Sequence, residues 1–181
     1  MSEARAGSGP DRTSSPSDPL SRGTLAAVRI LAGLMWLQNV GWKLPPDFGR
    51  DSGRGLFKFV NFAVDHEVFA PYAWVVRELV LPNFILFGWV VLLTEASLGA
   101  FLILGLGTRF WALVGVAQSV AIAMSVLNAP HEWSWSYYLM IGIHLAIFGS
   151  ASGRTFGLDG LLRSGWKRSG SRVAGLLVKA S

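Results

Sequence analysis

The stretch FILFGWVVLLTEASLGAFLILGL, residues 84–106, decides the fold. It contains 23 residues and only one charge, that of Glu95. A helix of this length is about 34 Å long at 1.5 Å per residue, which is enough to cross the hydrocarbon core of a membrane. Pro82 suits the start of such a helix, and Gly105 and Gly107 suit its end. The stretch therefore predicts a membrane-spanning helix.

Charged residues are scarce on both sides of this stretch. The chain of 181 residues has 16 Lys and Arg and 11 Asp and Glu, so that 15% of it is charged, whereas soluble domains usually reach about 25%. Between Leu79 and Gly153 the only charged residues are Glu95, Arg109 and Glu132. The centre of the chain is thus expected to lie in lipid.

Three more apolar segments predict spans, at residues 24–44, 110–127 and 133–151. Pro45 and Pro46 are expected to end the span at 24–44, and Thr108 is expected to cap the span at 110–127. The aromatic residues from Trp133 onward are expected to lie at headgroup level. The predicted fold is an all-α membrane protein with a bundle of four transmembrane helices. Its expected parts are a disordered cytoplasmic tail (1–22), a transmembrane domain (23–152) that includes an outer loop (45–82), and a basic amphipathic C-terminal tail (153–181).

The outer loop and the C-terminal tail each contain an amphipathic pattern. In the loop, apolar residues recur at helical spacing from Leu56 to Val64, while Lys58 and Asp65 take the opposite face. This pattern predicts a helix that shields the bundle or covers a substrate, and Pro71 is expected to break it. In the tail, residues 159–179 combine leucines with five basic residues, which predicts a helix on the inner leaflet with anionic lipid as its partner.

The distribution of Lys and Arg predicts the orientation. An arrangement with the N-terminus inside places ten of these residues in inner segments and five in outer segments. We therefore expect a multi-pass protein of the cytoplasmic (inner) membrane with both termini in the cytoplasm.

Composition also excludes several functions. The chain has no cysteine, so it supplies no disulfide, thiolate metal site or iron–sulfur cluster. A single intramembrane histidine cannot supply bis-histidine haem ligation, and no metal site is predicted. The net charge of +5 comes without a nucleic-acid recognition motif, so nucleic acid is not an expected partner.

Glu95 is the one charged residue deep in a predicted span. An ionisable group costs several kcal/mol near the middle of a bilayer unless it is paired, neutral or turned inward. Gly88 and Gly99 share its helical face, which indicates close approach of another helix. Arg29 of the first span is its expected partner, either as a structural clamp or with a functional role.

Three other polar side chains are expected to face the same interior. His144 lies near the middle of the fourth span with Tyr137 on the same face, and Gln118 lies near the middle of the third. A carboxylic acid, an imidazole and a phenol around an apolar pocket suit the binding and protonation of a quinone. Hydrogen bonding between helices, or a pathway for protons or small solutes, would use the same groups.

Five short motifs, in three parts of the chain, resemble those of the DoxX/DoxD family. The first span contains RILAGL at 29–34 and GWKL at 41–44, the next two contain EASLG at 95–99 and LGLGTR at 104–109, and GRTFGLD follows at 153–159. Their order and spacing cover roughly residues 24–163. The longer outer loop and the GWKLPP stretch are closer to the DoxD branch, the membrane subunit of thiosulfate:quinone oxidoreductase.

The resemblance implies a membrane subunit that passes electrons from thiosulfate or another small reductant to quinone, its diffusible electron acceptor. A second subunit or soluble redox protein is the implied partner beside the lipid bilayer. The sequence leaves open whether the chain is itself the enzyme, a non-enzymatic scaffold that docks a redox protein on its basic tail, or a transporter. The expected catalytic residues are Glu95, Arg29 and His144, and the expected quinone-binding residues are Gln118, Tyr137, Lys43 and Trp42.

Overall fold

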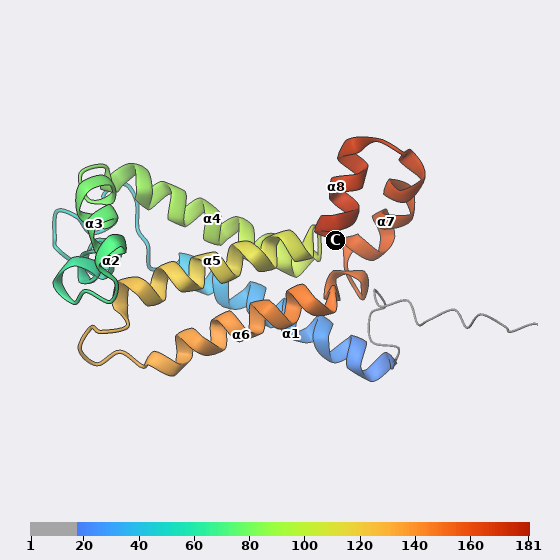
Figure 1. Cartoon of the computed structure of the whole chain (residues 1–181), viewed down its shortest axis with the longest axis horizontal. Helices are drawn as coiled ribbons and strands as arrows, with labels where there is room; N and C mark the ends of the chain where they lie inside the picture. The colour runs from blue at the N-terminus through green and yellow to red at the C-terminus, as the bar shows by residue number, and fades with distance from the viewer. Residues whose placement is uncertain (1–17) are drawn as a thin grey trace, which may run out of the picture.

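The computed structural model describes residues 18–181, and every regular element in that range is helical. Four long helices form the body of the molecule, with shorter helices at its two ends (Figure 1). The long helices are α1 (Pro19–Val40), α4 (Phe84–Leu104), α5 (Thr108–Val126) and α6 (Ser134–Ser150). One end carries α2 (Gly55–Asp65), α3 (Ala70–Val75) and a π-helical turn (Val76–Val80), and the other carries a 3-10 turn (Ser152–Arg154), α7 (Leu158–Ser169) and α8 (Arg172–Ala180).

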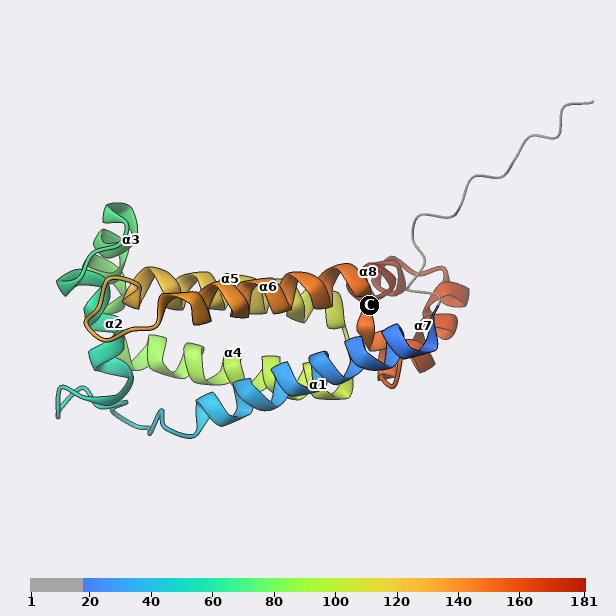
Figure 2. The ribbon, with the colours of Figure 1, turned by 90° about the horizontal axis from the view of Figure 1, so that it is seen from below.

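The long helices form two layers. Helix α1 packs mainly on α4, and α5 packs mainly on α6, as Figure 2 shows from a second direction. Large apolar side chains point away from both layers, including Leu86 and Leu93 of α4, which are 64% and 59% exposed. Outward leucines on a paired helix suit contact with lipid chains.

Three helices within residues 18–181 are long and apolar enough to cross a membrane, namely α1, α4 and α5. Helix α6, the fourth predicted span, has 17 residues and is about 26 Å long. It runs beside the others but is shorter than each of them (Figure 2).

The boundaries of the first span differ from the prediction at both ends. Helix α1 starts at Pro19 instead of Thr24, because the Asp18 carboxylate accepts a hydrogen bond from the Ser21 amide at 2.8 Å and caps it. Residues 19–22 of the expected disordered tail are therefore helical, and residues 1–17 lie outside the described range. The helix ends at Val40, so residues 41–44, which were expected to be helical, form a turn at 41–42 followed by irregular chain.

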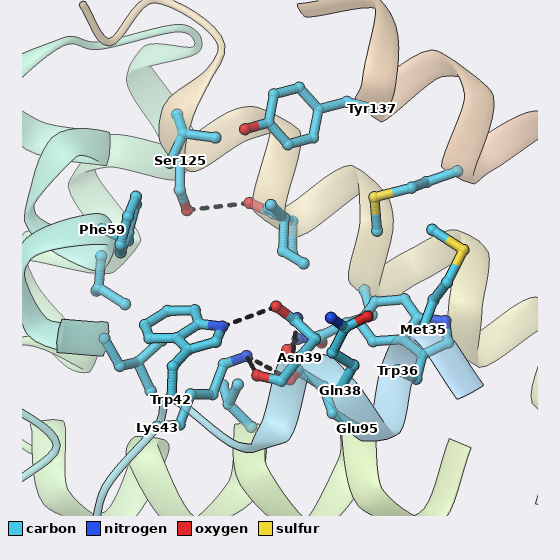
Figure 3. Close-up of a pocket in the computed structure, with 18 of the residues that line it drawn as sticks. Met35, Trp36, Gln38, Asn39, Trp42, Lys43, Phe59, Glu95, Ser125 and Tyr137 are labelled. Atoms are coloured by element: carbon cyan, nitrogen blue, oxygen red, sulfur yellow. Dashed lines mark hydrogen bonds and ion pairs between the residues drawn. The ribbon is translucent and has the colours of Figure 1, made fainter. Parts of the chain in front are cut away.

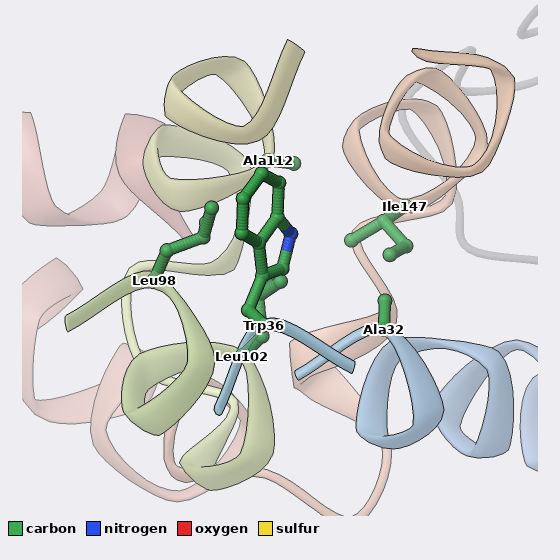
Figure 4. Close-up of a cluster of buried hydrophobic side chains, with 6 residues drawn as sticks. All are labelled: Ala32, Trp36, Leu98, Leu102, Ala112 and Ile147. Carbon is green, nitrogen blue, oxygen red and sulfur yellow. The ribbon is translucent and has the colours of Figure 1, made fainter. Parts of the chain in front are cut away.

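A compact apolar cluster joins the two layers (Figure 4). Trp36 of α1 lies at its centre, 3% exposed. Next to it, α1 and α4 approach closely, because a Cβ on Gly33 would lie 2.8 Å from the Gly99 carbonyl oxygen. The other members of the cluster are Ala32, Leu98, Leu102, Ala112 and Ile147.

The predicted loop helix is present as α2, with Leu56 and Ala63 buried on its apolar face. Pro71 does not interrupt a helix as expected. It lies in the first turn of α3, where a proline removes no intrahelical hydrogen bond. Together α2 and α3 cover one end of the bundle (Figure 1).

The predicted single C-terminal helix is two helices. Gly170, with φ of +65°, ends α7 in the left-handed conformation and turns the chain into α8. The predicted cap of α5 is also different. The Thr108 side chain makes no cap bond; instead, the Asp159 carboxylate accepts from the amides of Gly107 and Thr108 at 2.8 and 2.9 Å.

Candidate functional site

A cavity of about 810 Å³ lies in the half of the bundle next to α2 and α3. All four long helices contribute to its wall, and α2 and α3 close part of its end. Most of the wall is apolar, with a few polar groups at defined places. Six of the seven predicted site residues line this cavity: Trp42, Lys43, Glu95, Gln118, Tyr137 and His144.

Lys43 and Glu95 form a buried ion pair in the wall. Their Nζ and Oε2 atoms are 2.5 Å apart, and the side chains are 2% and 1% exposed. The turn after Gly41 brings Lys43 back over the end of α1, where its ammonium also donates to the Asn39 carbonyl at 2.9 Å. Burial lowers the pKa of Lys43, and the adjacent Glu95 carboxylate limits that decrease. The pair therefore places the Lys43 amino group and the Glu95 carboxyl group side by side in the wall of an apolar space.

Two amides complete the surroundings of the Glu95 carboxylate. Gln118 Nε2 donates to Oε1 at 3.1 Å, and Asn39 Nδ2 donates to Oε2 at 3.3 Å. Trp42 holds Asn39 in turn, because its indole N–H donates to Asn39 Oδ1 at 2.9 Å. Figure 3 shows Asn39, Trp42, Lys43 and Glu95 together along one side of the cavity. Asn39 is a site residue that sequence reasoning missed, although it lies four positions before Lys43.

Arg29 lies outside the cavity. Its Nη2 donates to the Phe156 carbonyl at 3.0 Å, and the acidic group that acts on it is Asp159, at the end with α7 and α8. The expected pairing of Arg29 with Glu95 is therefore wrong. The two residues lie toward different ends of the bundle, and the side chain of Arg29 does not bridge that difference in depth.

Both ring nitrogens of His144 are engaged. The Trp36 indole N–H donates to Nε2 at 2.9 Å, and Nδ1 lies 2.7 Å from the Met140 carbonyl oxygen. These partners assign the neutral tautomer with the proton on Nδ1, because Nε2 must accept. His144 lines the cavity but has no free N–H for a ligand in this arrangement.

The His144 arrangement leads to a prediction about Gly115. A Cβ at this position would lie 2.0 Å from His144 Cδ2, so the imidazole must move and its bond to Trp36 must break. We expect Gly115→Ala to lower the free energy of unfolding by about 1–3 kcal/mol. Gly142→Ala on α6 is the control, because no atom lies within 4 Å of the added carbon. Thermal unfolding in detergent tests this, and equal melting temperatures for the two variants would contradict it.

A second polar group faces the first across the cavity. The Tyr137 hydroxyl donates a short hydrogen bond to Glu132, and the Tyr72 hydroxyl donates to the Ala121 carbonyl at 3.0 Å and contacts Ser125 at 2.9 Å. Burial raises the pKa of Tyr72. Figure 3 shows Tyr137 and Ser125 opposite Trp42 and Lys43.

Sequence reasoning missed Tyr72, Ser125 and Glu132. Tyr72 and Glu132 belong to segments that sequence alone places in loops outside the membrane, and Ser125 lies near the end of a predicted span. Only the folding of α3 against α5 brings Tyr72 and Ser125 together.

The site combines an ion pair, amide donors and phenolic hydroxyls around an apolar space. Within residues 18–181, no cluster of three or more His, Cys, Asp or Glu side chains has the arrangement of a metal site. The groups present can hydrogen-bond a ligand, stabilise negative charge on an oxygen and exchange protons with it.

The family comparison covers nearly the whole described chain. A family model described as "TQO small subunit DoxD" matches residues 22–179. No curated protein and no solved structure matches the chain. The match includes α4, α5 and α6, all but the first three residues of α1, nearly all of both end regions, and every residue that lines the cavity.

Proposed function

This chain belongs to the DoxD family, and from that membership we propose that it is the membrane subunit of a thiosulfate:quinone oxidoreductase. In this proposal it lies in the cytoplasmic membrane with α6 as a fourth span and both termini in the cytoplasm. It binds quinone in the cavity and works with a second, larger subunit, in keeping with the family's description as a small subunit.

The observation that carries the proposal is the buried Lys43–Glu95 pair in the wall of an otherwise apolar cavity. The cavity's volume of about 810 Å³ falls within the usual range for small-molecule sites. A quinone is an apolar ring with two carbonyl oxygens on opposite sides. The polar groups on facing walls, around Lys43 and around Tyr137, suit these two oxygens (Figure 3).

Lys43 is the proposed proton donor. Two of its three N–H groups bind Asn39 and Glu95, and its Nζ also lies 4.3 Å from the centroid of the Trp42 ring at the cavity wall. Reduction of a quinone consumes two electrons and two protons, and negative charge develops on its oxygens. An ammonium in contact with one oxygen stabilises that charge and supplies a proton, and Glu95 and Gln118 keep the ammonium in place.

Electrons must come from outside this chain's own side chains. Without cysteine it cannot hold a sulfur intermediate covalently as a persulfide. Thiosulfate therefore reacts directly with the bound quinone or delivers its electrons through the partner subunit. His144 holds Trp36 in the cavity wall, and Arg29 stabilises the opposite end of the bundle.

Purified protein tests the proposal in two steps. The chain alone is titrated with a short-chain quinone, and quenching of tryptophan fluorescence is followed, because Trp36 and Trp42 line the cavity. The complex with its native partner is then assayed for thiosulfate-dependent quinone reduction. Saturable binding and turnover are expected. Absence of both binding and turnover would overturn the proposal.

Reporter fusions test the four-span topology. A reporter inserted after Glu132, between α5 and α6, should be active outside the cytoplasm, and one fused after Ser181 should be active inside it. If α6 crosses the membrane, the two reporters lie on opposite sides. Activity of both on the same side would show that α6 does not cross.

The basic helices α7 and α8 favour a scaffold as the second candidate function. They carry five Lys and Arg, which could dock a soluble redox protein. If the chain is only a scaffold, deletion of residues 163–181 abolishes function of the complex, whereas Glu95→Gln has no effect. A catalytic chain gives the reverse result. Solute uptake by proteoliposomes that depends on Glu95 would instead indicate a transporter.

A further inference from the structure

A second hollow lies at the end of the molecule opposite α2 and α3. It is a groove of about 460 Å³ between the turn that joins α4 to α5 and the pair α7–α8. Phe110 and Trp111 of α5 form one side, and Leu162, Trp166 and Leu177 form the other. The lining is almost entirely apolar, and none of it belongs to the quinone cavity.

The position of this groove is set by the helices that end beside it. Leu106 and Gly107, in the turn between α4 and α5, line it directly. Since α4 and α5 are long enough to cross a membrane, their connecting turn lies where hydrocarbon meets the headgroups. The groove opens toward the lipid-facing side of α5, because Phe110 is 53% exposed. Figure 1 shows α7 and α8 just beyond this end of the two helices.

The helices that form the groove have a basic surface. Lys167, Arg168, Arg172 and Lys179 are exposed and make no hydrogen bond or ion pair with residues 18–181. The only acidic residue of α7 and α8 is Asp159, which is fully buried beneath them. The exposed charged side chains of α7 and α8 are therefore all positive.

We propose that this groove binds an anionic phospholipid. One acyl chain occupies the apolar groove, and the phosphate lies against the basic residues around the α7–α8 turn. The positive charge of α7 and α8 favours an anionic headgroup. Because the groove lies where the hydrocarbon meets the headgroups, its ligand is expected to be a molecule whose apolar part is already in the bilayer. The site is separate from the quinone cavity and does not depend on the function proposed for it.

Lipid titration of the whole purified chain in detergent tests this site. The probes are phosphatidylglycerol and phosphatidylcholine with the same acyl chains, followed by native mass spectrometry and by the melting temperature. We expect one tightly retained phosphatidylglycerol and a higher melting temperature, with weaker retention of phosphatidylcholine. Equal retention of the two lipids would overturn the proposal.

Two variants separate the headgroup from the acyl chain. The triple variant Lys167→Gln, Arg168→Gln, Arg172→Gln should weaken phosphatidylglycerol binding by roughly 100-fold, because each basic residue near a membrane surface contributes about fivefold. Leu162→Asn should weaken binding of both lipids, because it places an amide in the apolar groove.

A control variant makes the same change of charge at the other end of the molecule. Arg50, Arg54 and Lys58 are exposed and lie near α2, so their replacement by Gln should leave phosphatidylglycerol binding unchanged. If this control weakens binding as much as the triple variant does, the attraction is nonspecific and the proposed site is wrong. If the triple variant still binds lipid but loses a co-purified partner subunit, the basic surface is a protein interface instead.

Discussion

Replacement of Lys43 by Met is expected to reduce quinone reduction by roughly 100-fold or more, because it removes a proton donor from the cavity. The same change should lower the free energy of unfolding by about 3–5 kcal/mol. It leaves the Glu95 carboxylate, which is fully buried, without its cation. Activity is measured as thiosulfate-dependent quinone reduction by the complex, and stability as thermal unfolding in detergent.

Lys58→Met is the matched control. Lys58 is an exposed lysine of α2 that does not line the cavity, so its replacement makes the same chemical change outside the site. We expect activity and stability close to those of the unchanged chain. An equal loss of activity in both variants would show that net charge, and not the buried ammonium, matters.

A double variant separates loss of function from loss of stability. In Lys43→Met with Glu95→Gln, both members of the pair are neutral, and the amide at position 95 can still bond Gln118. Removing both charges of a buried pair costs much less than removing one, so most of the stability should return. Activity should not return. If it did, Lys43 would serve only to stabilise the bundle, and the proposed proton donor would be wrong.

The positions of the long helices could be predicted from sequence because each depends on residues close together in the chain. An apolar run such as 84–106 cannot be solvated anywhere along its length, and Gly105 ends it locally with φ of +64°. The periodic spacing from Leu56 to Val64 identified α2 for the same reason. The family motifs identified residues 29–34 and 153–159 without showing that they meet.

The pairing of Glu95 with Lys43 could not be predicted from the sequence, because it depends on the turn that the chain makes after α1. Lys43 lies beyond the end of α1, and sequence places such a lysine at the membrane surface. The chain turns at Gly41 and returns the ammonium to the bundle, where the Lys43 side chain is 2% exposed. Arg29 was the obvious cation within a span, but the acidic group that acts on it, Asp159, comes from a segment 130 positions later that sequence assigns to a surface helix.

Asp159→Ala is expected to be the most destabilising change at the α7–α8 end. The carboxylate caps α5 through the amides of Gly107 and Thr108, and it is the acidic group that acts on the buried Arg29. Its removal leaves two amides without partners and takes away the acidic group that acts on the buried guanidinium. The expected loss is about 3–5 kcal/mol in the free energy of unfolding. Asp18→Ala, which removes the exposed cap of α1, is the control and should cost much less.

A double-mutant cycle identifies which part of that loss comes from charge. Asp159→Asn keeps the size of the side chain and one acceptor for α5, but it leaves Arg29 unneutralised. Arg29→Met alone leaves the buried carboxylate unneutralised, although its bonds to Gly107 and Thr108 persist. If the charges of Asp159 and Arg29 stabilise each other, the double variant Asp159→Asn with Arg29→Met loses less free energy of unfolding than the sum of the two single losses. Additive losses would instead show that Asp159 acts only as a cap that joins α7 to the start of α5.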